Sequence, residues 1–256
     1  MLRFASLGSG SKGNATLIES GKNDNDTRIL LDCGFSTKEI ERRLAKLGRT
    51  AQSLTAIVIT HEHSDHVSGA GRLSRKYSIP VWLTVGTSHA CRDNDFYSTY
   101  YINSHSDFEI DDINLHPFPV PHDAREPCQF VFSDGALRLG VVTDLGYHTP
   151  HIINHLENLD SLLLECNYDE KMLLNGSYPQ SLKRRVHGSK GHLDNRHASD
   201  LLKKLKLDQL KNIIGMHVSE KNNTEEYAIN ALCEGMGCEQ SAVSLASQSE
   251  GFSWRE

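Results

Sequence analysis

The stretch 58-VITHEHSDHVSGAG-71 places three histidines and one aspartate within six positions, directly after an apolar run that is typical of a buried strand. In an extended chain, side chains two residues apart point to the same side, so His61 and His63 can share one bound ion. The following turn can aim Asp65 and His66 at a second point close by. Because imidazole nitrogens and a carboxylate oxygen suit zinc or a similar divalent metal, the stretch predicts a metal site rather than a solvated polar loop.

The composition limits the class of protein. The 256 residues are enough for a sizeable buried core. The formal net charge of −6 disfavours a globally basic nucleic-acid binder but leaves room for a local basic patch. Six cysteines without a C-x-x-C pair are typical of reduced thiols, so we expect a cytoplasmic protein. No signal-peptide pattern and no apolar stretch of roughly 18 residues is visible, so we expect no membrane partner. Nothing in the composition indicates an oligomeric state.

Short apolar runs bounded by turn residues recur along the chain and predict strands. They cover 3–7, 15–19, 28–32, 56–60, 81–85, 114–120, 129–133, 137–143, 161–165 and 212–217. Helical spacing of apolar residues appears between them, at 37–47, 197–205 and 224–234. No low-complexity linker or short repeat divides the chain. We therefore expect a single α/β domain, 1–256, with mixed sheets and helices outside.

A metal site needs more ligands than one loop supplies, and three further candidates each follow a predicted strand. They are His122, Asp144 and His217. A lone histidine at a strand end is more often an ordinary polar residue. The common position of all three at the exit of an apolar strand favours a shared site.

These residues together resemble the metallo-β-lactamase-fold hydrolases, whose pattern is H-x-H-x-D-H followed by a distant His, Asp and His. The resemblance implies an αββα sandwich of two mixed sheets flanked by helices, with the site at one edge of the sheets. It implies two divalent metal ions, and Asp32 in "ILLDCG" would orient a ligand histidine. One ion is implied at His61, His63 and His122, the other at Asp65, His66 and His217, with Asp144 as the bridge.

The implied ligand set suggests a mechanism. Two metals roughly 3.5–4 Å apart can hold a bridging hydroxide as nucleophile and polarise the substrate oxygen. An aspartate bridge, in place of cysteine, favours oxygen-liking ions, so both Zn²⁺ and Mn²⁺ stay open.

The stretch 190-KGHLDNRHASDLLKKL-205 resembles the phosphodiesterase branch of this superfamily, which includes tRNase Z. The resemblance implies that His192 binds the scissile phosphate and protonates the leaving oxygen, with Glu165 orienting it. Asp65, Glu165 and His192 are therefore the expected catalytic residues. The alternative is that His192 is a solvated residue at a helix start.

Other residues could contact a substrate. Cationic side chains gather in 181-SLKRRVHGSKGH-192 and suit a polyanionic backbone, although a solvated helix face is nearly as favoured. Glycines in 7-LGSGSKGNATLI-18 permit tight turns, and polar residues there offer donors. The expected substrate-binding residues are Ser11, Asn14, Asn167, Lys183, Arg184, Arg185 and Lys190.

These stretches, with "THEHSDHVSG", "ECNYD" and "GHLDN", look like the YycJ/VicX (WalJ) subfamily over nearly the whole chain. That resemblance implies a 5′-to-3′ DNA exonuclease, with DNA as the partner. Asp194 is a departure, since we expect Ser there. Only 22 positions separate His122 from Asp144, and 73 separate Asp144 from His217. These spacings leave no room for the substrate arm of tRNase Z or the extra domain of β-CASP enzymes.

Two alternatives remain open at this point. One is a small-molecule hydrolase of the same fold, acting on a cyclic phosphodiester, thioester or lactone. The other is a regulatory protein that uses the fold without catalysis, which intact ligands at every position disfavour.

Overall fold

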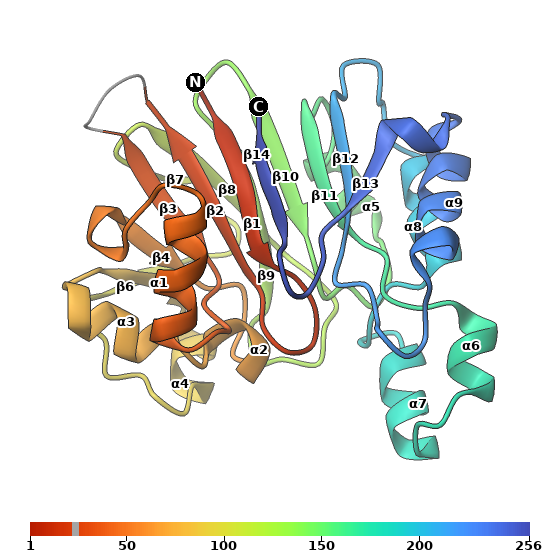
Figure 1. The fold of residues 1–256 in the computed structure, drawn as a ribbon, viewed down its shortest axis with the longest axis horizontal. Helices are drawn as coiled ribbons and strands as arrows, with labels where there is room; N and C mark the ends of the chain where they lie inside the picture. The colour runs from red at the N-terminus through yellow and green to blue at the C-terminus, as the bar shows by residue number, and fades with distance from the viewer. Residues whose placement is uncertain (22–25) are drawn as a thin grey trace.

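In the computed structural model, which describes residues 1–21 and 26–256, two seven-stranded mixed sheets pack face to face with helices on both outer faces (Figure 1). This architecture confirms the αββα sandwich. None of the helices described is both long and apolar enough to span a membrane.

The first sheet runs in the order β14-β1-β2-β3-β4-β5-β6. Its first three strands in sequence form antiparallel hairpins, and β3 to β6 are parallel. Parallel neighbours need crossover segments, which here carry the helices of one outer layer. The strands are β1 (Arg3–Gly8), β2 (Ala15–Ser20), β3 (Thr27–Leu31), β4 (Ala56–Val58), β5 (Val81–Thr84), β6 (Thr99–Ile102) and β14 (Phe252–Arg255), and the helices are α1 (Thr37–Lys46), α2 (Ser64–Val67), α3 (Ala70–Tyr77) and α4 (Val85–Ala90).

The second sheet runs in the order β13-β12-β11-β10-β9-β8-β7, antiparallel from β7 to β10 and parallel from β10 to β13. Its strands are β7 (Phe108–Ile110), β8 (Ile113–Pro119), β9 (Cys128–Ser133), β10 (Arg138–Val142), β11 (Ser161–Glu165), β12 (Asn212–Met216) and β13 (Val243–Leu245). Its helices are α5 (Pro150–His155), α6 (Glu170–Asn175), α7 (Gln180–His187), α8 (Asn195–Leu202) and α9 (Glu225–Met236). Helices α6 and α7 extend beyond the strand ends (Figure 1).

All ten predicted strands and all three predicted helices are confirmed, with bounds that differ by a few residues. The strands that the periodicity missed are the three- and four-residue strands β6, β7, β13 and β14. Such short segments hold too few residues to show an alternation, and the neighbouring strand fixes their conformation. Asp194, the departure noted above, is buried and accepts a hydrogen bond from the His197 N–H at 2.7 Å, so it caps α8.

The core lies in three layers that follow from this order. Apolar side chains of both sheets fill the central layer, and two outer layers pack each sheet against its helices. Strand β9 is buried along its whole length because both of its faces are covered. Phe130 and Phe132 point into the central layer, whereas Val131 faces the helices. The two packed sheets bring the ends of β3, β4, β10, β11 and β12 to one edge of the molecule (Figure 1).

Truncation of the central layer tests this packing. Phe130→Ala should lower the free energy of unfolding by about 3–5 kcal/mol, because it leaves a cavity between the sheets. Phe130→Leu, which conserves most of the volume, should cost only about 1 kcal/mol. Urea unfolding followed by circular dichroism measures both. Equal costs for the two variants would contradict the inter-sheet position of this ring.

Candidate functional site

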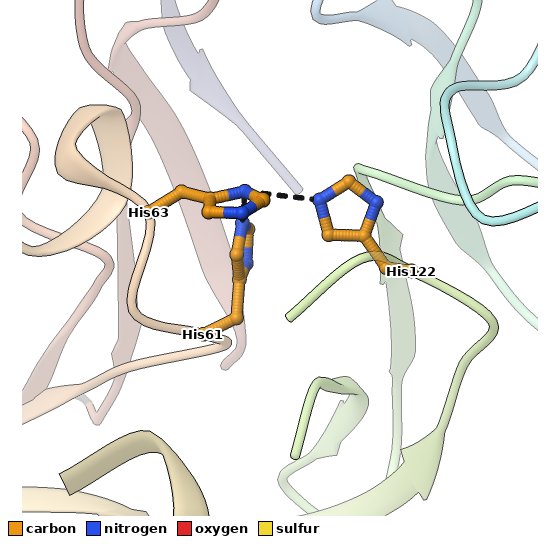
Figure 2. Close-up of side chains that lie close together, drawn as sticks. All are labelled: His61, His63 and His122. Carbon is orange, nitrogen blue, oxygen red and sulfur yellow. Dashed lines mark hydrogen bonds between the residues drawn. The ribbon is translucent and has the colours of Figure 1, made fainter. Parts of the chain in front are cut away.

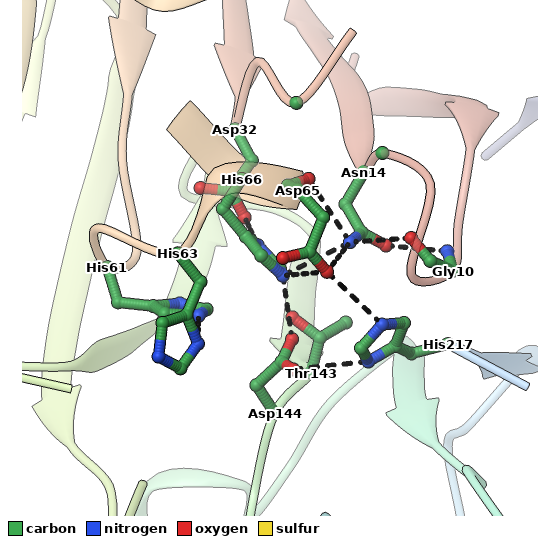
Figure 3. Close-up of polar contacts among 12 residues, drawn as sticks. Gly10, Asn14, Asp32, His61, His63, Asp65, His66, Thr143, Asp144 and His217 are labelled. Atoms are coloured by element: carbon green, nitrogen blue, oxygen red, sulfur yellow. Dashed lines mark hydrogen bonds and ion pairs between the residues drawn. The ribbon is translucent and has the colours of Figure 1, made fainter. Parts of the chain in front are cut away.

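The histidines and aspartates singled out in the sequence meet at the edge where the strands end (Figure 3). Asp32, Asp144 and His217 each follow a strand and adopt left-handed φ angles of 61°, 54° and 52°. Residues other than glycine rarely adopt this conformation, and where they do the strain often marks a functional site. Here the abrupt turn ends each strand and directs the side chain across the edge.

Three histidines form the first cluster, which Figure 2 shows with their ring nitrogens converging. His63 Nδ1 lies 3.0 Å from His61 Nε2 and 3.1 Å from His122 Nε2. The opposite nitrogens have their own partners: His61 Nδ1 lies 2.9 Å from the Thr60 hydroxyl, and His122 Nδ1 lies 2.9 Å from the Gly191 carbonyl. Burial lowers the pKa of His61 and of His122, which keeps both rings neutral. Neutral imidazoles are the form that binds metal.

Asp65, His66 and His217 form the second cluster (Figure 3). Asp65 Oδ2 lies 3.6 Å from His66 Nε2 and 3.5 Å from His217 Nε2. Asp144 stands between the two clusters, because its Oδ2 lies 3.0 Å from His66 Nε2 and its Oδ1 lies 3.9 Å from His122 Nε2. The two clusters therefore share one carboxylate.

The clusters fit a divalent metal on two counts. The donor atoms of each cluster lie within 4.8 Å of one another and are imidazole nitrogens and carboxylate oxygens. Two of these atoms, Asp144 Oδ2 and His217 Nε2, are buried without a well-formed hydrogen bond. Their nearest polar neighbours are other donors of the clusters, His66 Nε2 at 3.0 Å and Asp65 Oδ2 at 3.5 Å. Buried polar atoms without such a bond are rare, and both face the other donors. A bound cation would satisfy them.

Asp32 contacts Nδ1 of His66, the ring nitrogen that faces away from the second cluster. Its Oδ2 lies 2.7 Å from His66 Nδ1, and its Oδ1 accepts hydrogen bonds from the Thr60 N–H and hydroxyl at 2.9 and 3.0 Å. Burial alone would lower the pKa of His66, but the charges of Asp144 and Asp32 outweigh it and raise that pKa. The contact leaves Nε2 of His66 directed at the second cluster, which is the arrangement that orients metal ligands in proteins.

The glycine-rich loop between β1 and β2 supports the second cluster from the other side. Asn14 is buried, and its Nδ2 donates to Asp65 Oδ2 at 3.3 Å while its Oδ1 accepts from the Gly10 N–H at 2.8 Å. The Ser9 hydroxyl accepts a hydrogen bond from the His217 N–H at 2.9 Å. Gln248 closes the loop by accepting from the Lys12 N–H at 2.7 Å and donating to the Gly13 carbonyl at 2.9 Å.

Gly34 explains why these segments lie so close together. The Asn14 N–H donates to the Asp65 carbonyl at 2.7 Å, and the Gly34 N–H donates to the Asn14 carbonyl at 3.0 Å. A Cβ on Gly34 would lie 1.8 Å from the Asp65 carbonyl oxygen, so only glycine fits there.

Glu165 and His192 form a pair beside the second cluster. Glu165 is fully buried; its Oε1 lies 2.8 Å from His192 Nδ1, and its Oε2 accepts from the N–H groups of Leu145 and Leu193 at 2.7 and 3.0 Å. Burial raises the pKa of Glu165, but the charge and hydrogen bond of His192 outweigh it, so the pKa lies below its ordinary value. The charge and hydrogen bond of Glu165, together with the charge of Asp144, outweigh burial and raise the pKa of His192. His192 itself lines the cleft.

A cleft of about 330 Å³ opens over these residues. Of the expected substrate-binding residues, Ser11, Asn167 and Arg185 line it. Asn14 instead bonds Asp65, and Lys183 is buried with its Nζ donating to the Leu174 carbonyl at 2.7 Å. Arg184 and Lys190 are exposed and do not line the cleft.

Several residues at this site escaped the sequence analysis. Asp123 contacts both Arg185 and the histidines, and its position after His122 was the available signal. Tyr178, Leu182 and Val186 also line the cleft, but their spacing is that of any amphipathic segment, so no pattern distinguished them.

Comparisons with known proteins agree with this geometry. A family model described as "Beta-lactamase superfamily domain" matches residues 27–218. The chain is 33% identical to exodeoxyribonuclease WalJ of Streptococcus pneumoniae over 232 residues, 88% of this chain and 85% of that protein. It is 33% identical to exodeoxyribonuclease YycJ of Bacillus anthracis over 231 residues, 89% of this chain and 86% of that protein. The metallo-β-lactamase fold protein YhfI from Bacillus subtilis shares the fold, with a TM-score of 0.75 over 100% of both chains at 15% identity.

The contact between Asp32 and His66 generates a prediction. Asp32→Asn should weaken zinc binding about 10- to 100-fold, because the amide holds and polarises the imidazole less well. Competition with a chromogenic chelator measures the affinity. Asp208→Asn, at an exposed aspartate of the opposite layer, is the matched control. Wild-type affinity in Asp32→Asn would show that His66 is not a ligand held in this way.

Proposed function

Because the chain belongs to the β-lactamase superfamily, we propose that it is a metal-dependent phosphodiesterase, and specifically a 5′-to-3′ DNA exonuclease. The observation that carries the proposal is the Glu165–His192 pair, which places His192 at the cleft beside the donor clusters. A cationic imidazole next to a metal site suits a phosphodiester, whose attacked group is an anion. The two exodeoxyribonuclease relatives support DNA as the substrate, and the resemblance to their subfamily supports the direction.

We assign two divalent cations, Zn²⁺ or Mn²⁺, to the two clusters. One would bind His61, His63 and His122, the other Asp65, His66 and His217, with Asp144 shared. Such ions, when bound, lower the pKa of a bound water and stabilise charge on the attacked phosphate. The burial of Asp144 Oδ2 and His217 Nε2, which contact only other donors of the clusters, supports this assignment.

Side chains of the protein provide the other functions that the proposed reaction needs. Glu165 fixes the tautomer and rotamer of His192 through Nδ1, which leaves Nε2 to contact the phosphate and to give its proton to the leaving oxygen. Two backbone N–H groups hold Glu165 itself, so the pair cannot swing away from the cleft. Asn14 keeps Asp65 in place, and Asp32 keeps His66 in place. Six cysteines carried as free thiols suit the reducing cytoplasm as the site of action.

A small-molecule hydrolase is the second candidate function. The observation that favours it is the size of the cleft, about 330 Å³, which suits a small ligand as well as the end of a strand. A thioester or lactone lacks the anionic group that a protonated His192 would bind, so a cyclic phosphodiester is the small substrate that fits better.

The direct test compares substrates. The purified protein with Zn²⁺ or Mn²⁺ should degrade end-labelled DNA from its 5′ end, and chelation should abolish the activity. Asp144→Ala should lower turnover by at least about 10³-fold, because it removes a donor that both clusters share. Gel electrophoresis of 5′- and 3′-labelled strands reports the direction. Turnover of a thioester, lactone or cyclic phosphodiester, with DNA left intact, would instead support the second candidate.

The role of His192 can be separated from metal binding. His192→Ala should retain the wild-type metal content but lower the rate of phosphodiester cleavage by roughly 10²- to 10⁴-fold, the usual contribution of a general acid. Metal content by mass spectrometry and single-turnover cleavage of DNA measure the two effects. His197→Ala, at a partly exposed histidine of α8 that pairs with Asp194, is the control. Undiminished cleavage by His192→Ala would make this histidine a structural residue.

A further inference from the structure

One wall of the cleft differs in character from the rest. Four residues from α7 and the segment before it line the cleft together with residues of the donor clusters: Tyr178, Leu182, Arg185 and Val186. Tyr178 and Leu182 pack on a small apolar cluster of Tyr168, Leu173 and Val186 and are only partly covered. The Lys221 ammonium lies 5.6 Å from the centre of the Tyr178 ring, and this exposed cation can move aside or pair with a phosphate when a base stacks there. This wall therefore combines an aromatic ring, an aliphatic side chain and a cation.

Arg185 is held in place by Asp123. Its Nε lies 2.5 Å and its Nη2 3.3 Å from the Asp123 carboxylate oxygens. The same carboxylate lies 3.5 Å from His122 Nε2 and 3.8 Å from His63 Nε2. A guanidinium has five N–H donors, so Nη1 stays available. The Arg185 side chain is 52% exposed, which leaves this cation accessible from the cleft.

A nucleotide matches this wall chemically. A guanidinium held in place binds a phosphate by charge-assisted hydrogen bonds, and a partly open aromatic ring stacks on any base. A cleft of about 330 Å³ is at the small end of ligand pockets, so it accommodates one nucleotide rather than a length of strand. Neither a thioester nor a lactone needs both features.

We propose that the wall formed by α7 and the segment before it recognises the terminal nucleotide of the substrate: Arg185, positioned by Asp123, binds a phosphate, and Tyr178 stacks on the base. The proposal rests on the proposed phosphodiesterase function and identifies its product as a mononucleotide. Asp123 acts through Arg185 and is a positioning residue, whereas Arg185 and Tyr178 touch the substrate.

Two matched substrates test the stacking. Thymidine 3′-para-nitrophenyl phosphate and methyl para-nitrophenyl phosphate share the scissile bond, but only the first has a base, joined through O3′ as in a 5′-terminal nucleotide. Tyr178→Ala should raise KM roughly 5- to 150-fold for the thymidine substrate alone, and Tyr178→Phe should behave as wild type. Arg185→Ala should raise KM about 10- to 100-fold for both substrates, with Arg185→Lys restoring part of the loss. Arg196→Ala, at an exposed arginine of α8, is the control.

A double-mutant cycle tests the positioning role of Asp123. Asp123→Asn, assayed at saturating metal because its carboxylate also lies near His122 and His63, should raise KM with kcat little changed. It should have no further effect in an Arg185→Ala background, because the two residues act as one unit. Additive effects of the two substitutions, or a fall in kcat with unchanged KM, would overturn this role.

The experiments distinguish failure of the proposed phosphodiesterase function from failure of the proposed nucleotide-binding role of this wall. Absence of cleavage of both aryl phosphodiesters would contradict the phosphodiesterase function. Binding of thymidine 5′-monophosphate, measured by calorimetry, then still tests the wall: weaker binding in Tyr178→Ala and in Arg185→Ala would support it. An equal loss on both substrates from Tyr178→Ala, oligonucleotides as first products from DNA, or a loss from Arg184→Ala as large as that from Arg185→Ala would overturn it.

Discussion

The burial of four carboxylates at one edge of two sheets is the constraint on which this structure depends. One network of contacts joins the four carboxylates, which belong to Asp32, Asp65, Asp144 and Glu165. Asp32, Asp144 and Glu165 are almost fully buried. Charges buried together are costly unless each is paired and hydrogen-bonded. Imidazoles and backbone N–H groups provide much of that pairing, and two divalent cations would balance the four negative charges. The same atoms that need this compensation are those that would perform the hydrolysis.

The fold meets this constraint with segments from distant parts of the chain. The loop after β1, the end of β3 and the motif after β4 are joined by backbone hydrogen bonds, and Gly34 permits their close approach. From the second sheet, β10, β11 and β12 contribute Asp144, Glu165 and His217 at their ends. Each group is thus fixed by a strand of the core, so the donors are held in position before any ligand binds.

The two sheets could be predicted from the sequence, and the residues singled out for a metal site lie together, because both features depend on local patterns. Apolar runs mark strands, and a polar residue at a strand end marks the shared edge, as His122 and Asp144 illustrate. Contacts that depend on tertiary packing could not be predicted from local sequence patterns. Lys183 was expected to face a substrate, but its position on the inner side of α7 buries it, and its Nζ bonds the Leu174 carbonyl. Asn14 was expected to contact substrate as well, yet it bonds Asp65, since the fold of the glycine loop turns it inward. The partnership of Asp123 with Arg185 joins residues 62 positions apart, which no local pattern reveals.

The contacts of Gln248 bear on when, during synthesis, the site can form. A nascent chain that has emerged as far as His217 already contains every cluster residue. It still lacks Gln248, which holds the loop carrying Ser9 and Asn14, and it lacks β14, which pairs with β1. Ribosome-bound intermediates would therefore have the donors and this loop, but not the contacts from Gln248 and β14 that hold the loop in place. The support of the site therefore depends on residues that are synthesised after all of its donors.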